Sequence, residues 1–156
     1  MGSLIRQMRI RVGMRTIEFS LELICGLFIM LFIYAALSKL SDIQQFRVQL
    51  GQSPMLTAYA KWVSWFVPAA EIGISILLMI GALRRIGLYA ALFLMVTFTT
   101  YIFIIMNFSP FVPCSCGGVL ENLGWTEHLF FNLVFVAFGI FGILLQYKVV
   151  EGKRGL

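Results

Sequence analysis

Two cysteines separated by a single residue lie in a short polar segment of an otherwise apolar chain, Pro113-Cys114-Ser115-Cys116-Gly117-Gly118. A disulfide between Cys114 and Cys116 closes a very small ring, and strained disulfides have more oxidising potentials than ordinary ones. The two glycines that follow leave the sulfurs open to a partner. The pattern therefore indicates thiol–disulfide exchange, with metal binding and two thiols without a role as the alternatives.

The chain has one histidine, His128, which follows the cysteine pair closely and stands beside Glu127. An imidazole there can lower the pKa of a thiol, act as a base, or join Cys114 and Cys116 as a ligand for copper or mercury. The plain alternative is a half-exposed residue at the membrane surface. The third cysteine, Cys25, lies in the first apolar run, roughly 18 Å deeper in the membrane than the outer end of that run. We therefore expect it to be a small core residue.

Three polar residues stand in or at the ends of apolar runs: Lys39, Glu71 and Asn107. A carboxylate in lipid is costly unless it has a partner, so Glu71 is a candidate functional residue. Lys39 is the obvious partner. Glu71 then either pins two helices together through Lys39 or handles a proton or ligand. Asn107 is expected to form a hydrogen bond between helices.

The elements that position these residues are four long apolar runs, at about 19–37, 62–83, 86–108 and 129–147. About 20 residues of helix cross the hydrocarbon of a bilayer. Only 12% of the residues are charged, against about 25% in a soluble domain. The runs do not alternate, which excludes a β-barrel. We predict an all-α membrane protein, a four-transmembrane-helix bundle at 19–147, flanked by basic segments at 1–18 and 148–156.

The connections between the runs also carry helix signals. Ser41 is expected to cap a short interfacial helix on which Ile43, Phe46 and Leu50 share one face. Thr126 is expected to cap the fourth spanning helix.

The distribution of Lys and Arg predicts the orientation of the bundle. Nine lie before the first run, between the second and third, or after the fourth; three lie in the other connections. The nine are Arg6, Arg9, Arg11, Arg15, Arg84, Arg85, Lys148, Lys153 and Arg154, and the three are Lys39, Arg47 and Lys61. Both termini are therefore expected in the cytoplasm and the cysteine loop outside, where bacteria keep disulfides oxidised. The basic residues are split among separate segments, so no nucleic-acid site is predicted.

Several motifs resemble those of a known family. The segments 34–40 (YAALSKL), Pro68-x-x-Glu71 and Arg84-Arg85 resemble the DoxX-like membrane proteins. The segments 111–121 (FVPCSCGGVLE) and 124–128 (GWTEH) resemble the MauE branch of that group. MauE is associated with maturation of periplasmic methylamine dehydrogenase, so the resemblance implies disulfide handling and a four-helix bundle in the bacterial inner membrane.

The chain also resembles DsbB and the vitamin K epoxide reductase relatives, which are membrane thiol oxidoreductases that use a quinone. A quinone is thus the cofactor to consider, although no residue identifies one. Those proteins have a second cysteine pair, whereas this chain has a single Cys-x-Cys.

The sequence thus predicts a multi-pass inner-membrane protein, a candidate thiol–disulfide oxidoreductase, with its cysteine loop on the periplasmic side. Cys114, Cys116 and His128 form its predicted site. The expected partners are the lipid bilayer and a periplasmic thioredoxin-like or disulfide-containing protein. The alternatives are soft-metal handling by the same three residues and a non-catalytic assembly scaffold.

Overall fold

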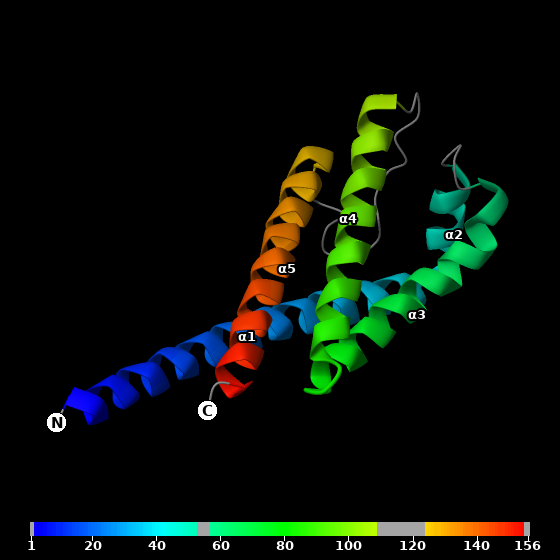
Figure 1. Ribbon diagram of the computed structural model, residues 1–156. Coiled ribbons are helices and arrows are strands. Elements are labelled where there is room, and N and C mark those ends of the chain that lie inside the picture. Colours follow the sequence, from blue (N-terminus) through cyan, green and yellow to red (C-terminus); the bar gives the residue numbers. More distant parts are fainter. Residues whose placement is uncertain (1, 53–56, 109–123, 155–156) are drawn as a thin grey trace.

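The structure, a computed structural model, describes residues 2–52, 57–108 and 124–154 (Figure 1). Its elements are α1 (Gly2–Ser41), α2 (Ile43–Gln52), the 3-10 helix η1 (Thr57–Tyr59), α3 (Ala60–Met79), α4 (Arg84–Phe108) and α5 (Trp125–Arg154). Every element of the described part is helical, which confirms the predicted all-α class.

Four of these helices are long and apolar enough to cross a membrane, and the predicted number of spans is confirmed. The spanning segments are Gly13–Ser41, Thr57–Met79, Arg84–Phe108 and Thr126–Gly152. A helix suits this environment because it satisfies its backbone hydrogen bonds within one segment, where lipid offers no partner. The second helix ends at Met79, before the expected Leu83, because Ile80–Leu83 forms the turn into α4.

The four spanning helices form a ring in which each packs against two neighbours: α1 and α4 both contact α3 and α5. Figure 1 shows α4 and α5 running alongside each other, and the N-terminal part of α1 extending beyond the other helices. Consecutive spanning helices run in opposite directions (Figure 1). The last turns of α1 and α4 and the first turns of α3 and α5 therefore share one end of the bundle. We call it the loop end, because residues 109–123 join α4 to α5 there.

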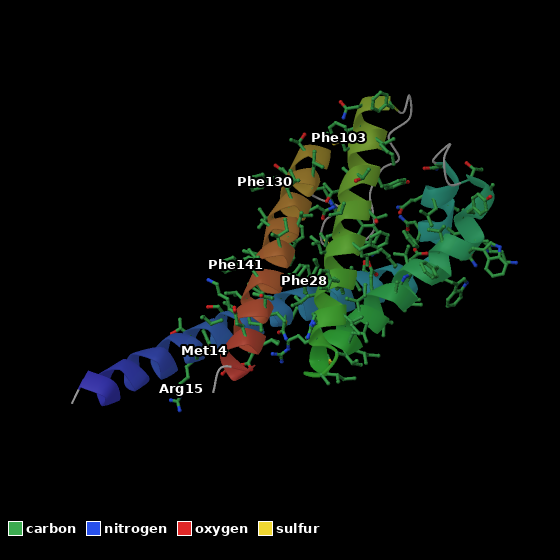
Figure 2. All side chains as sticks on the ribbon, viewed as in Figure 1. Met14, Arg15, Phe28, Phe103, Phe130 and Phe141 are labelled. Atoms are coloured by element: carbon green, nitrogen blue, oxygen red, sulfur yellow. The ribbon has the colours of Figure 1, made fainter. Side chains whose placement is uncertain are left out.

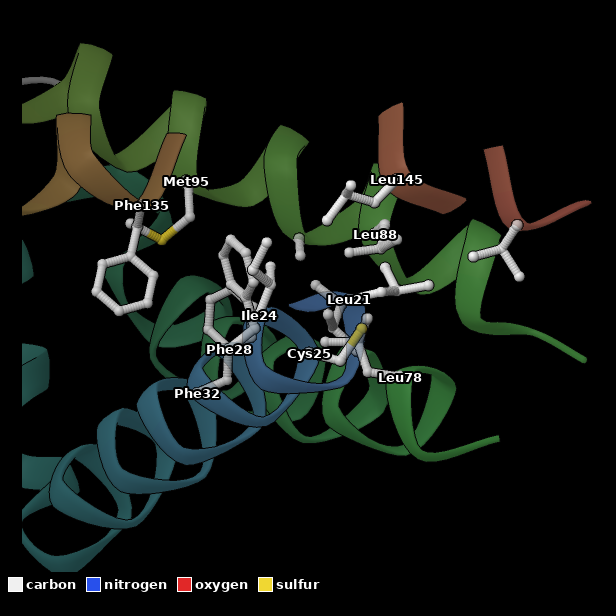
Figure 3. Packing of buried hydrophobic residues seen from close by; sticks show 13 residues of the cluster. Leu21, Ile24, Cys25, Phe28, Phe32, Leu78, Leu88, Met95, Phe135 and Leu145 are labelled. Atoms are coloured by element: carbon white, nitrogen blue, oxygen red, sulfur yellow. The ribbon is translucent and has the colours of Figure 1, made fainter. Parts of the chain in front are cut away.

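The core lies between the four helices (Figure 3). On α1 the buried positions recur every three or four residues, at Leu21, Ile24, Cys25, Phe28 and Phe32, which is the spacing of one helix face. The ring of Phe28 meets that of Phe135 edge-on, with centroids 5.4 Å apart. Cys25 lies in this core as a free thiol, as expected.

Many large apolar side chains point away from the bundle. Phe103, Phe130 and Phe141 are each more than half exposed and project outward from α4 and α5 (Figure 2). Such a surface is a liability in water and is normal in lipid, where no hydrophobic force drives these rings inward. The outward rings thus support the bilayer as the surroundings of the bundle.

The short helix α2 is present, but its cap differs from the expected one. Ser41 is the last residue of α1, and its hydroxyl donates to the carbonyl of Leu37 at 2.8 Å. Asp42 takes the capping role instead, because its Oδ1 accepts a hydrogen bond from the backbone N–H of Gln45 at 3.0 Å. On α2, Phe46 and Leu50 are buried. The prediction of the helix and its apolar face was right, and that of its cap was wrong by one residue.

The turn between α3 and α4 depends on a close approach at Gly87. A Cβ atom at this position would lie 3.0 Å from the backbone nitrogen of Leu78. We expect Gly87→Ala to lower the unfolding free energy by about 1–3 kcal/mol, since backbone must shift to admit the methyl group. Gly73→Ala is the matched control, because a Cβ there meets nothing within 4 Å. Thermal unfolding in detergent checks this, and equal melting temperatures for the two variants would contradict it.

Candidate functional site

An ion pair links α1 to α3 inside the bundle, as the sequence suggested. Lys39 Nζ lies 2.7 Å from Glu71 Oε1 and donates a hydrogen bond to it. The side chain of Glu71 is 0% exposed and that of Lys39 is 13% exposed. Lys39 occupies the last turn of α1, so the pair lies near the loop end. Burial of a charge is costly, and the pairing of Lys39 with Glu71 offsets that cost for both groups.

The ammonium group of Lys39 has further partners. It donates to the carbonyl of Ala35 at 3.3 Å. The ring centroids of Phe46 on α2 and Phe98 on α4 lie 5.9 Å and 5.8 Å from Nζ, within the range of cation–π attraction. Lys39 therefore gathers α1, α2, α3 and α4 around a single positive charge.

Glu71 belongs to a buried face of α3 that carries small and polar residues. This face contains Ala60, Ser64, Pro68, Glu71, Ile74, Ser75 and Leu78. The hydroxyl groups of Ser64 and Ser75 donate to carbonyls of their own helix, those of Lys61 and Glu71, both at 2.9 Å. The serines are thus satisfied within α3, and their small size lets a neighbouring helix approach closely.

The first turn of α5 places His128 at the loop end. Gly124 precedes the helix, and its backbone N–H donates to Glu127 Oε2 at 2.9 Å. The N–H of His128 donates to the carbonyl of Gly124 at 3.0 Å. The bond from Gly124 to Glu127 is one half of a capping box, in which a carboxylate in the first turn accepts a hydrogen bond from the backbone N–H of the capping residue. The expectation that Thr126 caps this helix was wrong, because α5 begins at Trp125 and its cap is Gly124, two residues before Thr126.

His128 and Glu71 each carry polar side-chain atoms that lack a hydrogen-bond partner within the described residues. Within the described residues, both ring nitrogens of His128 and the Oε2 atom of Glu71 are buried and have no hydrogen-bond partner. Lys39 lies close enough to both side chains to act on them electrostatically. Lys39 thus pairs with Glu71 and also acts on His128, and we call these three residues the polar cluster.

Two other polar residues were interpreted less well from the sequence. Asn107 was expected to bond between helices, but it is exposed and its Nδ2 donates to the carbonyl of Phe103 in its own helix, at 2.8 Å. Asn132 was not singled out, yet it is buried, with 6% of its surface exposed. Asn132 follows His128 by four residues and Phe135 follows Asn132 by three. This spacing on one helix face was the signal available for it.

The cysteine pair itself lies outside the described residues, since Cys114 and Cys116 fall in 109–123. The segment leaves α4 at Phe108 and enters α5 at Trp125, so both of its ends are anchored at the loop end. In the part of the chain that the structure describes, no three His, Cys, Asp or Glu side chains come together as a metal site. The predicted alternative with Cys114, Cys116 and His128 includes two undescribed residues and stays a prediction.

The chemistry open to the described residues is proton transfer rather than nucleophilic attack. A carboxylate oxygen and a neutral imidazole nitrogen each accept a proton, and both stand unpaired in the polar cluster. The nucleophile that the sequence predicts belongs to the adjoining segment. The two ends of that segment, at Phe108 and Trp125, lie at the loop end, as Lys39 and His128 do.

Comparison with known proteins supports the resemblance seen in the motifs. The family model of the methylamine utilisation protein MauE matches residues 17–145, which include the second and third spanning segments, most of the first and fourth, and the cysteine segment. Neither the curated proteins nor the solved structures contain a significant match. The chain is therefore a multi-pass membrane protein that belongs to the MauE family.

Proposed function

We propose that this protein is a thiol–disulfide redox protein of the bacterial inner membrane, which supports disulfide formation or maturation of extracytoplasmic proteins. The family name connects its relatives with methylamine utilisation. We therefore infer that its substrates are extracytoplasmic proteins of that process, with a disulfide-containing methylamine dehydrogenase as the leading candidate.

The observation that carries the proposal is the Cys-x-Cys sequence at 114–116, between two membrane-spanning helices. A pair of cysteines so close together can form a strained disulfide, and strained disulfides exchange readily with other thiols. The family match includes this segment. The segment also returns to the membrane at the turn that holds His128, a group able to accept or donate a proton.

The proposed reaction is an exchange in two steps. A thiolate of the partner attacks one sulfur of the Cys114–Cys116 disulfide, so that a mixed disulfide forms and the other cysteine leaves as a thiolate. A second thiolate of the partner then attacks the mixed disulfide, which leaves the partner oxidised and both cysteines of this chain reduced. The reverse sequence of steps reduces the partner. Each step breaks one sulfur–sulfur bond and forms another, and in total two electrons pass between the partner and this chain.

The orientation is part of the proposal and rests on charge. Nine Lys and Arg residues lie on the side of the termini and the α3–α4 turn, against three at the loop end. The positive-inside rule then places the loop end in the periplasm. A disulfide is stable there, whereas cytoplasmic thiols are kept reduced.

Labelling of thiols in intact spheroplasts tests this proposal. We expect a membrane-impermeant maleimide to label Cys114 and Cys116 only after mild reduction, and without lysis. The strained pair should be reduced more easily than ordinary structural disulfides, at a potential above about −300 mV. Titration with redox buffers before labelling measures this potential.

The Cys114→Ser/Cys116→Ser double variant is the control, because it retains only the buried Cys25 and should remain unlabelled. So small a ring constrains the unfolded chain weakly, so the double variant should keep its stability. Labelling that requires lysis would contradict the orientation. Labelling without reduction would show that the pair is not a disulfide.

A further inference from the structure

Glu71 is fully buried, but only one of its two oxygens is paired. Oε1 accepts the hydrogen bond from Lys39 at 2.7 Å. Oε2 has no hydrogen-bond partner in the described part of the chain. A carboxylate that served only to pin Lys39 would be expected to use both oxygens, because an unpaired buried acceptor is destabilising. The free oxygen therefore calls for a role beyond the ion pair.

Protonation of Oε2 is compatible with the contacts that Glu71 already makes. A carboxyl group that carries its proton on one oxygen still accepts hydrogen bonds on the other. The bond from Lys39 to Oε1 can thus persist in both states, and the helices need not move. Lys39 also keeps its contacts with Ala35 and with the rings of Phe46 and Phe98.

The surroundings of Glu71 limit the groups that can share a proton with it. On α1 the charged neighbour is Lys39, which acts directly on Glu71. On α5 the titratable group of the cluster is His128, whose ring nitrogens are both open. Around Lys39, α2 and α4 contribute the phenyl rings of Phe46 and Phe98. His128 is therefore the proton acceptor of the described cluster, since Lys39 is a donor.

The cluster is not sealed from its surroundings. The side chain of Lys39 is 13% exposed, and His128 is half-buried in the first turn of α5. Both residues lie at the loop end, whereas Glu71 lies deeper, in the middle of α3. The partly exposed Lys39 thus links the buried Glu71 to the loop end.

We propose that Glu71 is a proton-exchange site, which takes up and releases a proton on Oε2 from the loop-end side of the membrane, with Lys39 as its fixed partner and His128 as the neighbouring acceptor. One use of this site rests on the proposed function. The attacking thiol must lose a proton and the departing thiolate must gain one, and the cluster can hold that proton between the two steps.

Covalent labelling with the hydrophobic reagent dicyclohexylcarbodiimide tests the site in the full-length protein in membranes. The reagent takes the proton of a carboxylic acid onto one nitrogen, and the carboxylate oxygen bonds to its central carbon. The acyl group then moves to nitrogen and leaves a stable acylurea. We expect peptide mapping to find this adduct on Glu71. Its yield should rise as the pH falls on the loop-end side, by up to about tenfold per pH unit.

The pH is changed on each side of right-side-out vesicles in turn, and the adduct on the exposed Glu22 of α1 is measured in the same digest for comparison. Lys39→Met should increase the yield on Glu71, because a carboxyl group without its cation is held neutral in hydrocarbon. No adduct on Glu71 at any pH, or a yield that follows only the opposite side, would overturn the proposal. The Cys114→Ser/Cys116→Ser variant should label equally, so this result is independent of the thiol chemistry.

Discussion

Cells that produce the Cys116→Ser variant are expected to accumulate a high-mass species that disappears on reduction. In this variant the Cys114 thiolate can still attack a disulfide of a partner protein, which is the partner-reducing direction of the exchange, and one sulfur of the partner leaves as a thiolate. The Cys116 sulfur that would resolve the resulting mixed disulfide is missing. The covalent complex should therefore persist, whereas the wild-type chain shows little of it. Non-reducing electrophoresis with an antibody against this protein measures the complex, and mass spectrometry of the excised band identifies the partner.

The reciprocal variant and the histidine variant complete this experiment. Whichever of Cys116→Ser and Cys114→Ser traps more complex retains the sulfur that the partner bonds to. His128→Ala in the Cys116→Ser background should still trap a complex, because exchange requires sulfur and an imidazole only adjusts the thiolate. No trapped species, together with stoichiometric Cu(I) binding that is lost in His128→Ala, would replace the redox interpretation with a soft-metal site.

The four spans were predictable from the sequence because lipid leaves the backbone few choices. A continuous apolar run of sufficient length must satisfy its hydrogen bonds within itself, and a helix does so. The ion pair was predictable for a related reason. Glu71 requires a partner within the hydrocarbon, and Lys39 is the basic residue nearest to it in depth. Both inferences follow from the cost of polar groups in lipid.

The rotation of each helix about its own axis could not be predicted in the same way. In a soluble protein the polar face of a helix shows which side is buried, but these helices are apolar on all sides. Phe28 and Phe130 look alike in the sequence, yet the first is fully buried and the second is 69% exposed. The burial of Asn132 was missed for this reason, since α5 has no polar face that would show which of its sides is buried.

The errors at the helix ends have a more local cause. Ser41 and Asp42 are adjacent, and both can accept a hydrogen bond from a free backbone N–H. The structure assigns that role to Asp42 because the hydroxyl group of Ser41 already donates to Leu37 in α1. At α5 the side chain of Glu127 reaches back to Gly124, so glycine can stand at the cap where Thr126 was expected. Composition alone does not distinguish such neighbours.

The ion pair itself leads to the second large expected effect. Glu71→Ala leaves the ammonium group of Lys39 mostly buried, facing two phenyl rings without a counter-charge. Removal of one partner from a buried pair typically costs about 3–5 kcal/mol. The double variant Glu71→Gln/Lys39→Met removes both charges at once and keeps similar side-chain volumes. We expect it to be more stable than Glu71→Ala, and more stable than either of its own single substitutions.

Unfolding in detergent, followed by circular dichroism, measures these differences as a double-mutant cycle. Lys61→Met is the matched control, because Lys61 is an exposed lysine on α3 near the same end of the bundle. Its loss should change the unfolding free energy by no more than about 0.5 kcal/mol. If Lys39 and Glu71 stabilise each other, the cycle gives a coupling energy of the same order as the single losses. If their losses simply add, the pair contributes no mutual stabilisation, and the burial of Glu71 then points to a proton-handling or ligand role instead.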